Sequence, residues 1–336
     1  MLPSIIIESK WTPYIAVVAT IFCFIQFFFF LRSTFVPPKR KFGGVPKKCN
    51  KTDGYKENVI AYVFDGKAVS VSGSPFSTKL TAFLRLTGIP HTIKEADFEK
   101  APKGKVPYIE HAGSFFGDSQ LIIRYLENTY DIAKMSVGAV KLLSGVKKPF
   151  VPFNKLTSTD QALSDAIRLT CEGELYWAIN SVRWCGEVGI GKKESLWDAT
   201  NALYFTAIPA FIRPALTAMI RTGTMKDAWS QGLARHSPAD QLYLATRAAR
   251  SLSVLLGDKQ FFLGDFPAEC DCIAFGTLDC LLDDSRWPNP LTVWVRQECP
   301  NLVQYVARFR SMVFADMVPG DVRPPSRETG TPIPAE

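Results

Sequence analysis

The sequence predicts an α/β lobe followed by an all-helical lobe, with a membrane-spanning helix in front of both. Residues 14–31 are apolar except for Thr20 and Gln26. Residues 59–64 form a β-branched and aromatic run, which is typical of a buried strand, and a polar turn with a helix-like pattern follows it. From residue 157 onward the apolar residues recur at helical spacing. A chain of 336 residues has room for all three parts.

Residues 1–31 are predicted to form an uncleaved, single-pass membrane anchor. A helix over residues 14–31 would be roughly 27 Å long at ~1.5 Å per residue, which is just enough for a bilayer core. Trp11 and Tyr14 would lie at one interface. A cleaved signal peptide fits less well, because the apolar region is too long and residues 30–34 lack a small-x-small cleavage pattern.

The net charge is concentrated directly after this segment. Residues 32–51 hold seven Lys and Arg and no acid, which equals the whole formal net charge of +7, so residues 52–336 sum to zero. These cations predict that the C-terminal side of the anchor faces the cytosol. Both the mitochondrial outer membrane and the endoplasmic reticulum are compatible with this topology. Residues 32–57 are predicted to be an extended Pro/Gly linker, whose cations either contact anionic lipid or only set the topology. A neutral globular part argues against nucleic-acid binding, which requires a basic face.

Residues 58–130 are predicted to form the first lobe, and it begins with strand, helix and strand. Pro75 has a preset φ and no N–H to lose, so it suits the start of a helix after the polar turn. Gly88-Ile-Pro90 ends that helix, and a second strand begins at Thr92.

A hairpin and a second helix complete the predicted first lobe. Residues 106–111 and 114–116 are predicted to be its two strands, with Gly113 supplying the positive φ of the turn. Asp118 or Ser119 is expected to cap the following helix, whose apolar residues face the sheet.

Three hydroxyls surround the start of the first helix. The succession of strand, polar turn and helix places Ser72, Ser74 and Ser77 where free backbone N–H groups point at an incoming ligand. This layout is typical of a thiol-handling domain of the thioredoxin type.

Three short motifs now indicate a family. Ser74-Pro-Phe-Ser77 resembles the first-helix signature of glutathione transferases and glutaredoxins. Val106-Pro107 occupies the place of their cis-proline, and Asp118-Ser119 resembles their acidic-Ser pair. The resemblance implies a glutathione-transferase-like fold, with an α/β thioredoxin-like N-terminal lobe and an all-α C-terminal lobe. Only about a dozen residues separate the second strand from the hairpin, so the helix that usually lies there, with some of its glutathione contacts, is expected to be shrunken or absent.

Motifs further along the chain are similar to a narrower group, the failed axon connections and metaxin-like branch of the glutathione transferase superfamily. They lie at residues 232–237, 255–265 and 299–308. The resemblance covers roughly residues 58–316. We expect an inter-lobe insertion at 131–156, the helical lobe at 157–318 and a disordered, proline-rich tail at 319–336.

Ser74 is the candidate catalytic residue. Thiol transfer needs a thiolate, and free thiols have pKa values near ~8.5. A helix N-terminus and a hydroxyl donor both stabilise the anion, and Ser74 matches the catalytic serine of Ser-Pro-Phe transferases. Ser72 and Ser77 are the fallback candidates. The alternative is that Ser74 is only an N-cap, contributing about 1 kcal/mol. With serine rather than cysteine at both 74 and 77, the site cannot carry out dithiol–disulfide exchange.

The same resemblance implies glutathione as co-substrate, bound by Phe76, Val106, Pro107, Asp118 and Ser119. A cis bond before Pro107 would aim the backbone amide of Val106 at the cysteinyl part of glutathione. The hydroxyl of Ser119 and the free helix N–H groups suit the γ-glutamyl carboxylate, and Asp118 could pair with its ammonium. The alternative is two ordinary capping residues.

Two lysines of the short loop before the hairpin could reach the glycyl carboxylate of glutathione. They are Lys103 and Lys105, and such lysines are usually solvated.

The eight cysteines show no repeated spacing, which favours free, mostly buried thiols in a reducing compartment. Cys270-Asp-Cys272 with Cys280 lacks the spacing of a zinc site. We expect His91 and His111 to be surface residues on their strands.

Two features of the helical lobe concern its packing. Residues 203–220 are apolar enough to suggest a second membrane span, but Arg213 at a bilayer centre would cost at least ~2.5 kcal/mol, so a kinked core helix is favoured. Ala268 and Asp271 provide only half of a capping box.

The leading hypothesis is a membrane-anchored protein that conjugates or binds hydrophobic electrophiles at a cytosolic membrane face. The alternative is a non-catalytic, metaxin-like adaptor in membrane protein handling. An aromatic-rich helical lobe fits either a small hydrophobic substrate or a protein partner. Its aromatic residues include Trp177, Trp184, Trp197, Tyr204 and Phe205.

Overall fold

The structure is a computed structural model, and it describes residues 17, 58–64, 70–186, 190, 199–201, 209, 211, 213–283 and 287–317. The chain divides into two compact units, Met1–Phe42 and Gly43–Glu336, and all elements named below belong to the second. Within the described part of the chain, no helix is both long and apolar enough to cross a bilayer. Apart from Val17, the predicted anchor lies outside the described residues, as do the linker up to residue 57 and the tail from 319.

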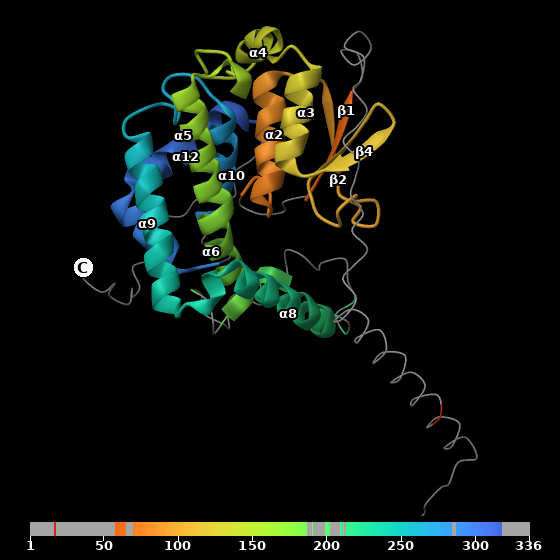
Figure 1. The fold of residues 1–336 in the computed structure, drawn as a ribbon, viewed down its shortest axis with the longest axis vertical. Coiled ribbons are helices and arrows are strands. Elements are labelled where there is room, and N and C mark those ends of the chain that lie inside the picture. The colour runs from red at the N-terminus through yellow and green to blue at the C-terminus, as the bar shows by residue number, and fades with distance from the viewer. Residues whose placement is uncertain are drawn as a thin grey trace, which may run out of the picture. The chain divides into compact units, whose positions relative to one another are not determined.

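The first lobe is built on a four-stranded sheet in the order β2-β1-β3-β4. The strands are β1 (Val59–Val63), β2 (His91–Glu95), β3 (Tyr108–His111) and β4 (Ser114–Gly117). β1 pairs parallel with β2 and antiparallel with β3, and β4 closes the predicted hairpin against β3. The helices α2 (Pro75–Thr87) and α3 (Ser119–Thr129) pack beside this sheet (Figure 1).

The segment between β2 and β3 contains turns and no helix over residues 96–107, all of which the structure describes. This confirms the expected loss of the intervening helix. Tyr62 and Tyr108 stack there with ring centroids 4.6 Å apart, and the Tyr108 hydroxyl donates to Asp97 O at 2.9 Å. The stacked rings and this hydrogen bond hold the loop in the absence of a helix.

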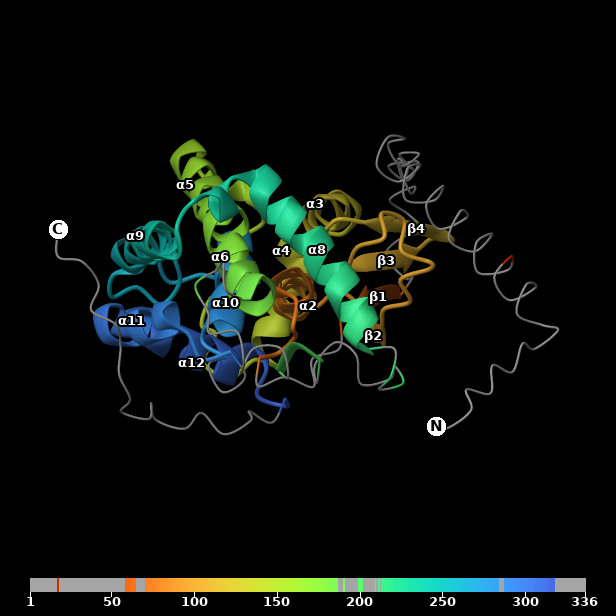
Figure 2. The ribbon, with the colours of Figure 1, turned by 90° about the horizontal axis from the view of Figure 1, so that it is seen from below.

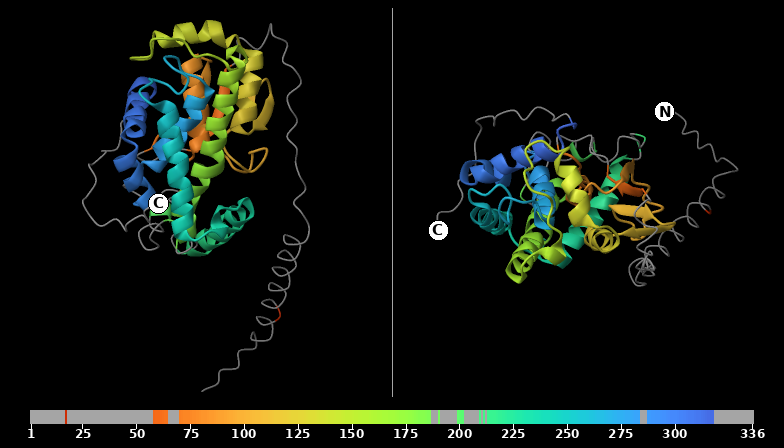
Figure 3. Two further views of the ribbon diagram at one scale, coloured as in Figure 1. Left: turned by 60° about the vertical axis from the view of Figure 1, so that its left-hand side comes forward. Right: turned by 90° about the horizontal axis from the view of Figure 1, so that it is seen from above.

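Local chemistry sets both ends of α2. Ser74 is the N-cap, Pro75 takes the first helical position, and Gly88 ends the helix with a φ of 69°. A left-handed φ of this size favours glycine. The helix α4 (Ile132–Val140) lies across this end of α2 (Figure 3), and a Cβ added at Gly88 would come within 3.1 Å of Ala139 Cβ.

The second lobe is helical. It contains α5 (Ser158–Leu169), α6 (Tyr176–Asn180), α8 (Arg213–Gln231), α9 (Pro238–Leu256), α10 (Glu269–Leu281), α11 (Pro290–Glu298) and α12 (Pro300–Val313), with π-helical turns at Thr170–Leu175 and Ser181–Cys185 and 3₁₀ turns at Phe153–Lys155 and Leu233–Arg235. Figure 2 shows α10 between α2 and the outer helices α9, α11 and α12.

The two lobes meet where α10 lies against the first turn of α2. Every residue of α10 is buried. A Cβ added at Gly276 would lie 2.5 Å from the carbonyl oxygen of Pro75, so a residue larger than glycine would push the helices apart. As predicted, half of a capping box forms: Asp271 Oδ2 accepts from Ala268 N at 2.9 Å, and Ala268 has no side-chain acceptor to complete it.

Two sequence expectations are wrong. His111 is 2% exposed rather than at the surface, because its ring lies among Tyr125 and Tyr130, whose hydroxyls are 2.8 and 3.0 Å from its two nitrogens. The described part of residues 203–220 is not a core helix, because α8 begins at Arg213 and most of its surface is exposed. His91 is half-buried, with Nδ1 2.7 Å from Ile89 O.

Candidate functional site

A cavity of about 660 Å³ lies between the two lobes, and the candidate catalytic residue and all five predicted glutathione-binding residues line it. These residues are Ser74, Phe76, Val106, Pro107, Asp118 and Ser119. They come from the start of α2, the loop before β3 and the start of α3. Lys103 and Lys105 line the same cavity. The fold therefore brings together three motifs that are separated by up to about forty residues in the sequence.

Only one of the three turn serines faces this cavity. The Ser72 hydroxyl donates to Phe64 O at 2.6 Å, and the Ser77 hydroxyl accepts from Phe64 N at 3.1 Å. Both side chains are thus used to tie the turn to the end of β1. Ser74 Oγ accepts from Ser77 N at 3.4 Å and lies in the cavity wall, which leaves its own proton without an acceptor among the described residues. Ser74 is therefore an N-cap and a cavity residue at once.

The turn that carries Ser74 is held by the helical lobe. Arg183 donates to Gly73 O at 2.6 Å, and Val71 N donates to Asp279 Oδ2 at 2.7 Å. The Cys280 thiol lies 3.2 Å from Ser72 O. Burial raises the pKa of Asp279, and the Arg310 guanidinium paired with it works in the opposite direction. These roles of Arg183, Asp279 and Cys280 were not predicted, since their partners in the turn are more than a hundred residues away in the sequence.

The floor of the cavity is aromatic on the side of the helical lobe. The peptide bond between Val106 and Pro107 is cis, as the sequence predicted. Phe76, in the first turn of α2, and Tyr176, in the helical lobe, meet edge to face with ring centroids 4.8 Å apart, and Trp177 packs on Tyr176 at 5.3 Å. The cavity therefore combines polar side chains from both lobes with a cluster of aromatic rings where the lobes meet.

Asp118 combines a capping role with a place in the cavity. Its Oδ1 accepts from Gln120 N at 3.1 Å and from Leu121 N at 3.3 Å, which makes it the N-cap of α3. Its φ is 90°, an unusual value for a residue with a side chain. Lys103 Nζ lies 3.6 Å from Asp118 Oδ2. Asp118, rather than Ser119, is therefore the cap, and the Ser119 hydroxyl has no partner in the described part of the chain.

Six further residues line the cavity that sequence reasoning did not select. They are Phe98, Gln120, Glu172, Tyr176, Asp227 and Ser230. Gln120 directly follows the acidic-Ser pair, which is a signal that could have found it. Glu172, Asp227 and Ser230 lie on helices of the second lobe, where no motif distinguishes them from solvated residues.

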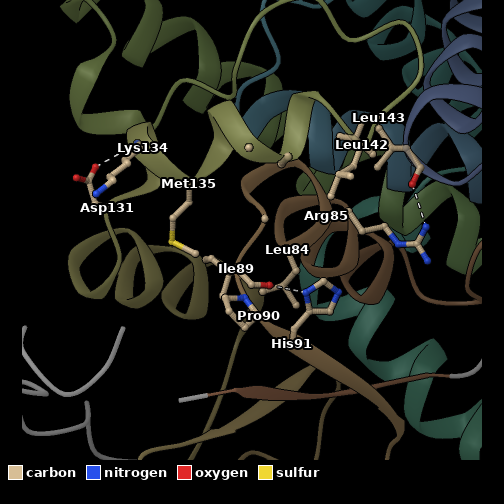
Figure 4. A pocket seen from close by; sticks show the side chains of 14 residues that line it. Leu84, Arg85, Ile89, Pro90, His91, Asp131, Lys134, Met135, Leu142 and Leu143 are labelled. Carbon is tan, nitrogen blue, oxygen red and sulfur yellow. Dashed lines mark hydrogen bonds between the residues drawn. The ribbon is translucent and has the colours of Figure 1, made fainter. Parts of the chain in front are cut away.

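A larger hollow of about 1160 Å³ lies at the other end of α2, beside α4 (Figure 4). Its lining is mostly apolar and includes Leu84, Ile89 and Met135. Arg85 donates to Val313 O at 3.0 Å there, so this cation is already engaged. None of the predicted site residues lines this hollow, whereas the smaller cavity contains the hydroxyl, carboxylate and lysine side chains that could bind glutathione.

The six described cysteines are free and buried, as expected. Cys23 and Cys49 lie outside the described residues. Burial raises the pKa of Cys171 and of Cys280 to about 12. Among described residues, no group of His, Cys, Asp and Glu has the arrangement of a metal site.

Comparisons with known proteins agree with this architecture. Residues 75–189 match the model of a glutathione S-transferase N-terminal domain, and residues 245–309 match that of a glutathione S-transferase C-terminal domain. The isoprene-epoxide–glutathione S-transferase of Rhodococcus is 30% identical over 70% of this chain and 91% of its own length. This chain belongs to the glutathione S-transferase superfamily.

Two further relatives define the branch. Failed axon connections of Drosophila melanogaster is 27% identical over 83% of this chain, which spans 62% of that relative's length. Human metaxin-2 is 22% identical over 78% of this chain and 91% of its own. The chain therefore lies in the metaxin-like branch of the superfamily, as its motifs predicted.

Proposed function

We propose that this superfamily member is a glutathione transferase, in which Ser74 stabilises the thiolate of glutathione for attack on hydrophobic electrophiles. The observation that supports it most is the convergence of all six predicted residues on one cavity, with Ser74 as the turn serine in its wall. The relative named for isoprene-epoxide conjugation favours the same chemistry.

The donor set of the cavity fits a tripeptide with two carboxylates and one ammonium. Ser119 and the lysines Lys103 and Lys105 can bind carboxylates, and Asp118 can bind an ammonium. Glutathione, when bound, supplies the sulfur nucleophile.

Ser74 would act on that sulfur through its hydroxyl. Because Ser74 Oγ receives the Ser77 N–H, its proton is oriented away from the helix and can be donated to an anion. The partial positive charge at the start of α2 adds to the effect. Phe76, Tyr176 and Trp177 would surround the apolar substrate and exclude water from the reacting sulfur.

The test is a glutathione titration of the purified protein, followed by Ser74→Ala. We expect millimolar or tighter binding by the wild type. The variant should show a higher pKa of bound glutathione and at least ~10-fold slower conjugation, which corresponds to roughly 1.4 kcal/mol of lost anion stabilisation.

Ser77→Ala is the matched control, because its hydroxyl bonds Phe64 N outside the cavity. It should lower stability and leave the thiol pKa unchanged. A wild type that binds no glutathione at millimolar concentration would overturn the enzyme proposal.

That outcome would favour the second candidate, a non-catalytic adaptor in membrane protein handling. The helix α8 supports it with exposed apolar side chains, since Met219 is 66% and Trp229 58% exposed. Such residues on one surface helix suit a protein partner. For either function we propose that residues 14–31 anchor the protein, with the globular part in the cytosol, on the basis of the sequence.

A further inference from the structure

A fully buried lysine lies behind the cavity wall. Lys79 is in the second turn of α2, and its side chain has no exposed surface. Its Nζ donates to Gln120 Oε1 at 2.5 Å and to Glu172 Oε1 at 2.9 Å, and Glu269 Oε1 lies 3.8 Å away. Burying an ammonium is costly unless it is paired and hydrogen-bonded, so these acceptors explain why it is tolerated.

The two short bonds join the two walls of the cavity. Gln120 is in the first turn of α3, Glu172 is in the π-helical turn of the helical lobe, and both line the cavity. The second carboxylate oxygen of Glu172 accepts from Arg168 at 2.9 Å. Glu172 is therefore paired with two cations, one at each of its oxygens.

Lys79 also decides which way the Gln120 amide faces. An ammonium has donors only, so the carbonyl end of the amide must face Nζ and the NH₂ end must face away. The oxygen and nitrogen of an amide are similar in size, and here the ammonium partner distinguishes them. No hydrogen bond joins that NH₂ to another described residue. Ser119, the neighbouring residue in the cavity wall, has an unpartnered hydroxyl in the same part of the structure.

We propose that Lys79 is a positioning residue that turns the Gln120 NH₂ into the cavity, where Gln120 adds a second donor beside Ser119, the residue that the family resemblance already assigns to the α-carboxylate of the γ-glutamyl residue. The inference rests on the proposed function, because its ligand is glutathione. Two neighbouring donors that lack acceptors match the two oxygens of a carboxylate. If Lys79 served packing alone, an apolar side chain would fill the same space without a buried charge.

The experiment compares glutathione with an analogue whose γ-glutamyl α-carboxylate is a primary amide, by calorimetric titration of the purified full-length protein. The wild type should prefer glutathione by at least ~10-fold, since a charge-assisted hydrogen bond is lost in the analogue. In Gln120→Glu, the introduced carboxylate keeps the bond to Lys79 through one oxygen and presents the other to the cavity. This variant should reverse the preference, and its melting temperature should not fall.

Lys79→Met releases the amide, so the preference for glutathione should shrink toward equality. A wild type that binds both ligands equally, or a Gln120→Glu variant that keeps the wild-type preference, would overturn the inference while the proposed function stands. A wild type that binds neither ligand overturns the proposed function and the carboxylate site with it.

A readout without ligand tests the positioning role separately, should Lys79→Met fold. In a ¹H–¹⁵N NMR spectrum, the pair of side-chain NH₂ signals of Gln120 is identified as the pair that is missing from the spectrum of Gln120→Glu. It should shift and broaden in Lys79→Met, and an unchanged pair would overturn the positioning role whatever the protein binds. Gln120→Glu keeps the inference falsifiable if Lys79→Met does not fold.

Discussion

Replacing Glu127 by glutamine should make the protein more stable at pH 8 and change little at pH 5. Glu127 lies on α3 and is 8% exposed. Its Oε1 accepts from Phe153 N at 3.0 Å, whereas its Oε2 has no donor within the described residues. The pKa of this carboxyl is raised from 4.5 to about 7, chiefly by burial. The Glu269 carboxylate also raises the pKa, whereas the hydrogen bond from Phe153 N and the charge of Arg124 lower it.

The sign and the size follow from this pKa. Between about pH 4.5 and 7 the native state keeps a proton that the unfolded chain has released, so stability from this group falls as the pH rises through that window. At about 1.4 kcal/mol for each unit of pKa, the full rise corresponds to about 3 kcal/mol above pH 7. Glutamine imitates the protonated acid and keeps the acceptor for Phe153 N. Its second buried N–H has no partner, so we expect a net gain of about 2 kcal/mol at pH 8.

The assay is urea unfolding of the purified wild type and Glu127→Gln at several pH values from 5 to 8. The difference in unfolding free energy should be near zero at pH 5 and grow to its full size by pH 8. Glu99→Gln is the control, because Glu99 is an exposed carboxyl, and its curve should follow the wild type. A Glu127→Gln curve parallel to the wild type over the whole range would refute the reasoning.

Three further outcomes are expected. Glutathione should raise the melting temperature of the wild type but not of Ser119→Ala, and equal shifts would show that Ser119 takes no part in binding. Its neighbour Asp118 caps α3, so Asp118→Ala should lower the free energy of unfolding by about 1 kcal/mol without ligand. Because burial raises the pKa of Cys171 and Cys280 to about 12, both thiols should react with thiol reagents only on unfolding, and rapid labelling of the native protein would contradict this. If residues 14–31 are an anchor, the full-length protein should stay in membranes after carbonate washing with its C-terminus open to cytosolic protease, and lumenal protection would contradict that topology.

The sequence by itself determined the features that depend on a few neighbouring residues. Ser74 and Pro75 start α2, and Gly88 and Gly113 take the left-handed conformations that their turns require. The cis bond before Pro107 was predicted instead from the resemblance of Val106-Pro107 to the cis-proline of glutathione transferases. Capping, turn geometry and backbone preference act over a few residues, so a pattern in the sequence can reveal them.

The tertiary structure alone decided which of these residues share a cavity with side chains from the other lobe. The pairing of Lys79 with Gln120 and Glu172 joins three helices, and no local pattern indicates that an isolated lysine in α2 is buried. The burial of His111 likewise depends on where α3 packs. Burial and ion pairing are set by contacts between segments distant in the chain, and they determine which polar groups keep a free donor for a ligand. The physical reason is that a charged side chain has the same sequence signature in solvent and in a core, and only its partners distinguish the two.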